Sequence, residues 1–316
     1  MNEFNLNHIK QLESESIHII REVASEFKKP VMLYSVGKDS SVMLHLALKA
    51  FAPGKIPFQL MHVDTGYKFK EMIDFREKKR NQYDLNLIVK KNLEPEALSL
   101  KPEDAPTDHY IYLKKTKPLL EGLKENEFDA AFGGARREEE KSRAKERVFS
   151  FRDENGVWDP KNQRPEIWNY YNPKLKPGQS VRVFPLSNWT EVDIWYYIRQ
   201  ENIEVVPLYF AKEREVLLRH GMYLRVDEYV QPKPEEEVVK MWTRYRTLGC
   251  SPSTGTIPSR ATTLDAAIRE ILLSRKSERE NIKPMDLYIT QVKFNALKNK
   301  LEKLTKSRPA LANEVQ

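Results

Sequence analysis

The sequence predicts an α/β fold in which a mostly parallel, five-stranded sheet is flanked by helices and followed by an irregular or helical C-terminal segment. Three observations lead to this fold class. Residues 31–34 form a short apolar run of the kind that a buried parallel strand shows. A turn of small residues follows, and apolar side chains then recur at helical spacing from Val42 to Leu48. A second apolar run at residues 59–63 completes a strand–turn–helix–strand unit, the building block of such sheets.

The remaining elements alternate in the same way along the chain. An amphipathic helix is expected at residues 8–28, and Thr190 is a predicted helix N-cap because Glu191 and Asp193 fall in the first turn after it. Residues 93–118 contain four prolines and are expected to form an ordered but irregular loop. The pattern also predicts a helix at residues 69–83 and strands at residues 85–89, 128–132 and 181–185.

The composition excludes several classes of protein. Of the 316 residues, 31% are charged and 40% hydrophobic, which is ordinary for a soluble protein. No apolar run is long enough to cross a bilayer and no export signal is evident, so we expect a cytoplasmic protein without membrane contact. The single cysteine, Cys250, excludes intramolecular disulfides and fits a reducing compartment. The net charge of +7 could serve nucleic acid, a phosphate-rich substrate or an acidic partner; we expect no nucleic acid.

The turn between the first strand and the next helix is suited to hold an anion. Four of its residues are small, namely Ser35, Gly37, Ser40 and Ser41. Small side chains let backbone N–H groups close around a phosphate. Lys38 adds a full positive charge, and the helix that follows adds its dipole.

This turn is not a Walker A loop, because the chain has Met32 where that motif needs Gly, and Asp39 where it needs Ser or Thr. It resembles instead the SGGKDS loop of the PP-loop ATP pyrophosphatase family, with Val36 in place of the first Gly. The resemblance implies cleavage of ATP between the α- and β-phosphates, with the loop holding the leaving pyrophosphate. An ordinary glycine turn is the alternative, but the HVDTG sequence at the end of the next strand favours a PP-loop.

Two further stretches come directly after predicted strands. Asp64 and Gly66 follow the second strand, where a carboxylate can accept a hydrogen bond from the nucleotide or help to hold Mg²⁺. An Asp-Thr-Gly turn also occurs without such a role. Gly133 and Gly134 follow the strand at residues 128–132 and let the backbone approach a ligand.

Arginines follow these glycines at Arg136, Arg137, Arg143 and Arg147. Arg143 and Arg147 are four residues apart, which would put them on one face of a helix. Arginine is the side chain suited to multidentate contacts with oxyanions. A solvated helix in which Glu139 pairs with Arg143 is the alternative, but it does not account for two glycines and two arginines at a strand end.

Longer stretches carry a more specific resemblance: SVGKDSSVMLHLALKAF, HVDTGYKF, FDAAFGGARREEEKSRAKERVFSFRD, WDPKNQRPE, VRVFPLSNWTEVDIWYYI, ENIEVVPLYFA and RYRTLGCSPSTG. Together they are similar to sulfate adenylyltransferase subunit 2, the small, ATP-using subunit family of the two-part bacterial ATP sulfurylases, over about residues 6–255. The family implies a PP-loop sheet and the conversion of ATP and sulfate to adenylyl sulfate and pyrophosphate. It also implies Mg²⁺ and a GTPase large subunit whose GTP hydrolysis drives this first step of sulfate activation.

We therefore expect a nucleotide-binding domain at residues 1–205 and a partner-contacting region at residues 206–316. Sulfate is already a dianion at neutral pH, so the site must position and neutralise charge and needs no general base. The expected catalytic residues are Lys38, Arg136, Arg137, Arg143 and Arg147, the arginines acting on sulfate and on developing charge. The expected ATP-binding residues are Ser35, Gly37, Lys38, Asp39, Ser40, Ser41, Asp64, Gly66, Gly133 and Gly134, and the expected Mg²⁺ ligands are Asp39 and Asp64.

The chain departs from the family in the loop at residues 93–118 and after Gly255. At residues 294–304 heptad-like spacing favours a surface or partner-binding helix. These changes bear on the acceptor and on pairing with the GTPase. Two alternatives stay open. One is a reductase or another PP-loop enzyme with a different acceptor, for which Cys250 would have to be catalytic although a structural role is favoured. The other is a non-catalytic nucleotide-binding module.

Overall fold

A six-stranded sheet forms the centre of the computed structural model, which describes residues 3–101, 107–139 and 146–274. Its strand order is β3–β2–β1–β4–β6–β5, and neighbouring strands are parallel except for β5 with β6. The strands are β1 (Pro30–Leu33), β2 (Gln59–Val63), β3 (Leu87–Lys90), β4 (Ala130–Phe132), β5 (Phe149–Arg152) and β6 (Ser180–Val183). The expected fold class is confirmed, and β5 is an edge strand that the sequence analysis did not predict.

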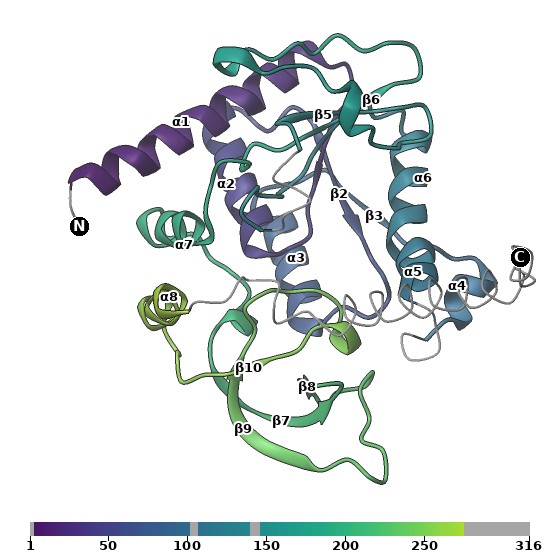
Figure 1. The fold of residues 1–316 in the computed structure, drawn as a ribbon, viewed down its shortest axis with the longest axis vertical. Helices are drawn as coiled ribbons and strands as arrows, with labels where there is room; N and C mark the ends of the chain where they lie inside the picture. The colour runs from purple at the N-terminus through teal and green to yellow at the C-terminus, as the bar shows by residue number, and fades with distance from the viewer. Residues whose placement is uncertain (1–2, 102–106, 140–145, 275–316) are drawn as a thin grey trace, which may run out of the picture.

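Helices cover both faces of this sheet. Alternate residues of each strand point to opposite sides, and apolar side chains on both sides pack against helices. The main helices are α1 (Glu3–Glu26), α2 (Lys38–Phe51), α3 (Lys70–Gln82), α6 (Lys117–Glu125) and α7 (Glu191–Gln200). Met32 of β1 belongs to the large core that includes side chains of α1, α2 and α7. Its neighbour Val31 packs in a smaller core with Leu119 and Leu123 of α6. Figure 1 shows α2 and α3 on one side of the sheet and α6 on the other.

Local sequence features explain where α7 begins and how closely α6 packs against the sheet. Thr190 caps α7 as expected, and its hydroxyl accepts from the Asp193 backbone N–H while the Asp193 carboxylate accepts from the Thr190 backbone N–H. Helix α6 lies close to β2 and β3 at Gly122, where a Cβ atom would come within 2.7 Å of the Met61 sulfur. Glycine at this position therefore sets the distance between the helix and the sheet.

The expectation of an irregular loop at residues 93–118 is wrong over most of its described part. The stretch holds α4 (Pro95–Ser99), α5 (Thr107–Ile111), the π-helical turn η1 (Tyr112–Thr116) and the start of α6. Pro95 and Pro118 stand in the first turns of α4 and α6, where a missing N–H costs no helical hydrogen bond. These prolines mark helix starts, which a count of prolines does not distinguish from a loop.

The C-terminal part contains a second sheet that the sequence analysis did not predict. This antiparallel sheet has the order β10–β9–β7–β8 and is built from β7 (Lys212–Arg219), β8 (Met222–Arg225), β9 (Val238–Arg244) and β10 (Ile257–Pro258). Helix α8 (Leu264–Leu273) follows it, as the expectation of helical structure in this part allows. Residues 294–304, where a further helix was expected, lie outside the described residues. The division of the chain at residue 205 stays a prediction.

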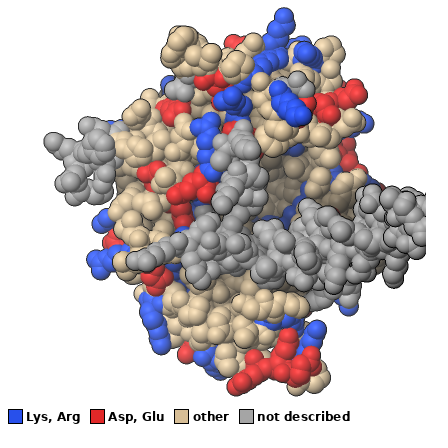
Figure 2. Space-filling view, in the orientation of Figure 1, with Lys and Arg blue, Asp and Glu red and all other residues tan. Residues whose placement is uncertain are grey.

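Contacts join the two sheets. The Ser251 backbone N–H donates to the Tyr67 carbonyl at 2.8 Å, which ties the second part to the segment after β2. A buried ion pair of 2.6 Å joins Arg246 to Glu191 at the start of α7. Figure 2 shows basic side chains over the upper part of this face and a group of acidic ones at its lower end, where Figure 1 places the second sheet. No helix within the described ranges combines the length and apolarity that a bilayer crossing requires.

Candidate functional site

The candidate site lies at the carboxyl ends of β1 and β4, where the strand order reverses. From β1 the chain proceeds to β2 and β3 on one side, whereas β4 and β6 lie on the other. Ligands of open α/β sheets bind at such a switch point. The loop after β1 leads into α2, and the glycines after β4 lie above it, because a Cβ at Gly134 would be 3.4 Å from the Asp39 Cβ and 3.5 Å from the Ser40 nitrogen. The two stretches that the sequence singled out are therefore neighbours.

The loop at residues 35–37 has a constrained backbone. Val36 has φ = 70°, the left-handed region that favours glycine and that a β-branched residue rarely adopts. Its side chain is fully buried in the large core, which holds the residue in this conformation. The Ser35 and Ser40 hydroxyls are 3.2 Å apart, and the Ser40 hydroxyl donates to the Gly37 carbonyl at 3.0 Å. The loop is thus braced before any ligand is bound.

Tyr209 contacts this loop from a distant part of the chain. The Lys38 backbone N–H, at the start of α2, donates to the Tyr209 hydroxyl at 2.8 Å across 171 residues of sequence. Tyr209 belongs to the short helix η5 (Pro207–Tyr209), and its buried ring makes an edge contact with Trp195. The sequence around Tyr209 predicts no site role for it, since no local pattern signals a contact of such long range.

Three charged side chains form the centre of the site. The Lys38 ammonium lies 3.1 Å from Asp39 Oδ2, and Arg136 Nε donates to Asp39 Oδ1 at 2.7 Å. Lys38 and Arg136 are each only 1% exposed, so both cations are almost completely withdrawn from water. Burial raises the pKa of Asp39, but Lys38 and Arg136 together outweigh it and hold that pKa below its usual value. Glu138, which is 54% exposed, lies 3.3 Å from Arg136 Nη1, so the wider group holds two cations and two carboxylates, and the cations are its most deeply buried members.

This arrangement predicts how Asp39→Asn changes stability with pH. The folded pKa of Asp39 is lowered, so its carboxylate stabilises the fold fully above the unfolded pKa of about 3.9, and this contribution is lost as pH falls through the folded value. At pH 7 the variant leaves two buried cations without their shared carboxylate, and we expect it to lose about 3 kcal/mol. The difference from wild type should shrink below about pH 4 in urea unfolding measured across pH.

Asp74→Asn is the matched control for this comparison. Asp74 is 65% exposed on α3 and lies 3.8 Å from Lys70. Its loss should change the free energy of unfolding by less than about 1 kcal/mol, both at neutral and at acidic pH. A destabilisation of Asp39→Asn that is the same at pH 7 and at pH 3 would contradict the assignment.

The end of β2 holds a second group of candidate residues. Asp64 Oδ1 accepts from the Gly66 backbone N–H at 2.8 Å, and Gly66 has φ = 82°, which makes glycine the suited residue in this turn. Thr65 Oγ1 lies 3.0 Å from Cys250 Sγ, and that cysteine is fully buried. Among the described residues no three His, Cys, Asp or Glu side chains gather as metal ligands. Both oxygens of Asp39 contact cations, so Asp64 is the better candidate for Mg²⁺.

The other expected arginines lie in different settings. Arg137 is 36% exposed, and its guanidinium donates to the Asn188 side chain. Arg147 is exposed and not helical, because the chain straightens there into β5. The expected helical face shared with Arg143 is therefore wrong at Arg147, and Arg143 itself lies outside the described residues. A role for these three arginines stays a prediction.

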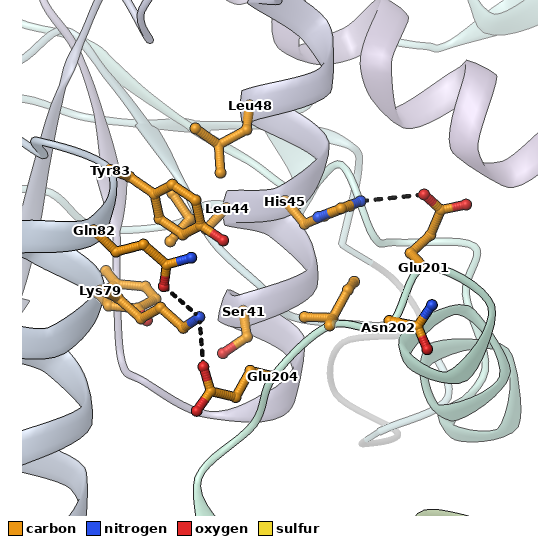
Figure 3. Close-up of a pocket in the computed structure, with 12 residues that line it drawn as sticks. Ser41, Leu44, His45, Leu48, Lys79, Gln82, Tyr83, Glu201, Asn202 and Glu204 are labelled. Carbon is orange, nitrogen blue, oxygen red and sulfur yellow. Dashed lines mark hydrogen bonds and ion pairs between the residues drawn. The ribbon is translucent and has the colours of Figure 1, made fainter.

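A cavity of about 240 Å³ lies between α2, α3 and the segment after α7. Figure 3 shows its charged lining in pairs. His45 lies 3.3 Å from Glu201, and the Lys79 ammonium lies 3.0 Å from Glu204. Glu201 also pairs with Lys49 at 3.0 Å, and burial lowers the pKa of His45. Because each of these carboxylates already pairs with a lysine, the cavity is poorly suited to a polyphosphate, and the loop after β1 is the better phosphate site.

Known proteins are similar to this chain over most of its length. Residues 29–256 match the family described as the phosphoadenosine phosphosulfate reductase domain. A sulfate adenylyltransferase subunit 2 of Aeromonas salmonicida is 59% identical over 276 residues, 87% of this chain and 89% of that protein. One of Psychromonas ingrahamii is 59% identical over 281 residues, 89% of this chain and 93% of that protein. A crystal structure of phosphoadenylyl-sulfate reductase from Candida auris in a phosphate complex aligns with a TM-score of 0.45 at 18% identity, covering 73% of this chain and 98% of that one.

Proposed function

Because the chain belongs to the sulfate adenylyltransferase subunit 2 family, we propose that it transfers the adenylyl group of ATP to sulfate. A sulfate oxygen attacks the α-phosphorus, and the bond from that phosphorus to the oxygen bridging to the β-phosphate breaks. The electron pair leaves with pyrophosphate, and no proton moves. The products are adenylyl sulfate and pyrophosphate.

The observation that carries this proposal is the group of Lys38, Asp39 and Arg136 at the switch point, where two deeply buried cations lie beside one carboxylate. The Lys38 ammonium and the backbone N–H groups of Asp39 and Ser40 are placed to hold the β- and γ-phosphates, while the Lys38 N–H donates to Tyr209. Asp39 fixes the Lys38 ammonium, and Arg136 fixes Asp39, so we assign Arg136 a positioning role. Gly134 keeps the space above the Ser40 nitrogen open for a phosphate oxygen.

We propose that Mg²⁺ binds with the nucleotide. Magnesium is commonly held by one or two carboxylates together with substrate phosphates, and Asp64 at the end of β2 supplies one such carboxylate. When bound, the ion neutralises phosphate charge. The chain's own contribution is to orient Asp64, whose Oδ1 accepts from the Gly66 backbone N–H.

The printed name of the relatives, subunit 2, implies a partner subunit. We propose that this partner is a GTPase, that its GTP hydrolysis drives the costly formation of the sulfate–phosphate anhydride, and that the complex works in the cytoplasm. The single cysteine of the chain fits that compartment.

The test is pyrophosphate release from ATP by the full chain, measured with and without sulfate and with and without the co-purified partner and GTP. We expect release that depends on sulfate and increases with the partner and GTP. Sulfate-independent release would contradict the proposal. Loss of activity in Cys250→Ser would favour the alternative of a reductase or another PP-loop enzyme with a different acceptor, although Cys250 is fully buried beside Thr65. Complete absence of nucleotide-dependent exchange of labelled pyrophosphate would favour a non-catalytic module.

A further inference from the structure

Four lysines gather at the carboxyl ends of β2 and β3, on the other side of β1 from β4. We call them the lysine cluster, which consists of Lys68, Lys91, Lys114 and Lys115. Lys91 follows β3 directly, and its Nζ would lie 3.3 Å from a Cβ at Gly66. The Lys114 ammonium lies 4.9 Å from the centre of the Tyr67 ring, in the segment after β2. Since β2 and β3 are parallel neighbours, these side chains meet at one edge of the sheet.

The positive charge of the cluster is buried at Lys114, whereas Lys68 and Lys115 are partly buried and Lys91 is exposed. Lys114 is only 4% exposed, and no ion pair to any lysine of the cluster occurs among the described residues. Burial lowers the pKa of Lys114, and Lys91 lowers it further. Burial likewise lowers the pKa of Lys68, and Lys115 adds to this effect. Asp64 acts on both Lys68 and Lys114, and its Oδ1 already accepts from the Gly66 backbone N–H.

The backbone around Lys114 is specialised. Lys114 and Lys115 belong to the π-helical turn η1, a rare conformation that frequently marks functional sites. The buried side chain of Asn92 donates to the Leu113 carbonyl at 3.0 Å, which supports the irregular turn from the end of β3. A buried ammonium without a carboxylate is costly, so a fold that holds one in a supported turn points to an anionic ligand.

We propose that the lysine cluster binds the acceptor of the reaction, a small tetrahedral dianion of the sulfate class. This inference rests on the proposed function. In an in-line displacement the attacking and leaving oxygens lie on opposite sides of the phosphorus. Pyrophosphate leaves toward the loop after β1, on the side of β4, so the acceptor enters from the side of β2 and β3. That is where the cluster lies, whereas Arg136 on the β4 side is engaged with Asp39 and Glu138.

The lysines act by neutralising charge. Sulfate and the triphosphate repel one another, and ammonium groups beside the acceptor reduce that repulsion without accepting or donating a proton in the step. Lys114 contributes most, because its burial keeps it from being screened by water.

Lys114→Met in the full chain, assayed with the partner and GTP, tests the proposal. We expect the KM for sulfate to rise by roughly 10- to 100-fold, as for the loss of one charge-assisted contact, while the KM for ATP changes less than about twofold. Binding of labelled sulfate in the absence of ATP should weaken by a similar factor. Methionine is a long, unbranched side chain like lysine and removes the buried charge, so the melting temperature without sulfate should stay the same or rise.

Lys117→Met is the matched control, because Lys117 lies one turn further on and pairs with Glu94 at the surface. It should leave both KM values within about twofold. Lys115→Met is the second variant should Lys114→Met fail to fold, since Lys115 is only partly buried. It should also raise the KM for sulfate and weaken sulfate binding.

The outcomes separate the inference from the function on which it rests. If wild type is active and the folded lysine variants keep the sulfate KM and sulfate binding of wild type, the inference is overturned and the function stands. If wild type releases no pyrophosphate in response to sulfate, yet binds sulfate and loses that binding in Lys114→Met, the anion site stands and the function fails. A fall in melting temperature of Lys114→Met without any change in sulfate binding shows a structural lysine and overturns the inference.

Discussion

Lys38→Met is expected to lower kcat/KM for ATP by about 10²- to 10³-fold in sulfate-dependent pyrophosphate release, the size of effect that follows removal of one preorganised charge from a buried site. The Lys38 ammonium is fixed by Asp39 Oδ2 at 3.1 Å and is only 1% exposed, so it faces developing charge without reorganising first. Arg136 still neutralises Asp39 in the variant, and the fold should therefore be retained.

Lys49→Met is the control in the same helix. Lys49 lies near the other end of α2, is 33% exposed and pairs with Glu13 and Glu201, so its replacement should leave kcat/KM within about twofold. Circular dichroism and urea unfolding of both variants would confirm that the fold is intact. If Lys38→Met is folded and has the kcat/KM of wild type, the loop after β1 has no catalytic role.

Arg136→Met is expected to destabilise the chain by about 3 kcal/mol and to abolish activity. The buried guanidinium of Arg136 connects three elements. Its Nε donates to Asp39 in α2 at 2.7 Å, and its Nη1 donates to Glu138 at 3.3 Å. Glu138 in turn accepts from the Glu191 backbone N–H at the start of α7. Loss of this link leaves Asp39 with Lys38 as its remaining cation, removes the connection to Glu138 and α7, and lets the Lys38–Asp39 pair move.

Arg137→Met serves as the neighbouring control, because Arg137 is 36% exposed. This replacement should lower the free energy of unfolding by less than about 1 kcal/mol. Urea unfolding measures the stability of both variants, and pyrophosphate release measures their activity. If Arg136→Met were as stable as wild type and raised only the KM for sulfate, Arg136 would be a sulfate ligand, as the sequence first suggested, and not a positioning residue.

Much of the fold could be predicted because its signals are local. The unit from β1 to β2 shows strand and helix periodicities directly in sequence, and the cap at Thr190 depends on Asp193 only three residues away. Strand β5 has four residues at the edge of the sheet and exists through pairing with β6, about thirty residues further along the chain. Strand β7 begins with Lys-Glu-Arg-Glu, whose charges hide a strand that its partner β9 stabilises.

The candidate site was predictable where its residues stand in contiguous motifs. Lys38 and Asp39 lie in the loop sequence itself, and Arg136 follows two glycines at a strand end. Tyr209 could not be found, since its contact with Lys38 depends on how the segment after α7 folds back across the sheet. The lysine cluster could not be found either, because its members are spread over three segments and only the π-helical turn brings Lys114 toward Tyr67.

The account depends most on where the triphosphate binds. A crystal structure of the chain with a non-hydrolysable ATP analogue, in which a methylene group joins the α- and β-phosphates, measures this directly. We expect the β- and γ-phosphates within hydrogen-bonding distance of the backbone nitrogens of Gly37, Asp39 and Ser40 and of the Lys38 ammonium, with the α-phosphorus between them and the lysine cluster. Phosphates bound in any other part of the molecule, such as the cavity between α2 and α3, would contradict the proposed site and the direction of attack inferred from it.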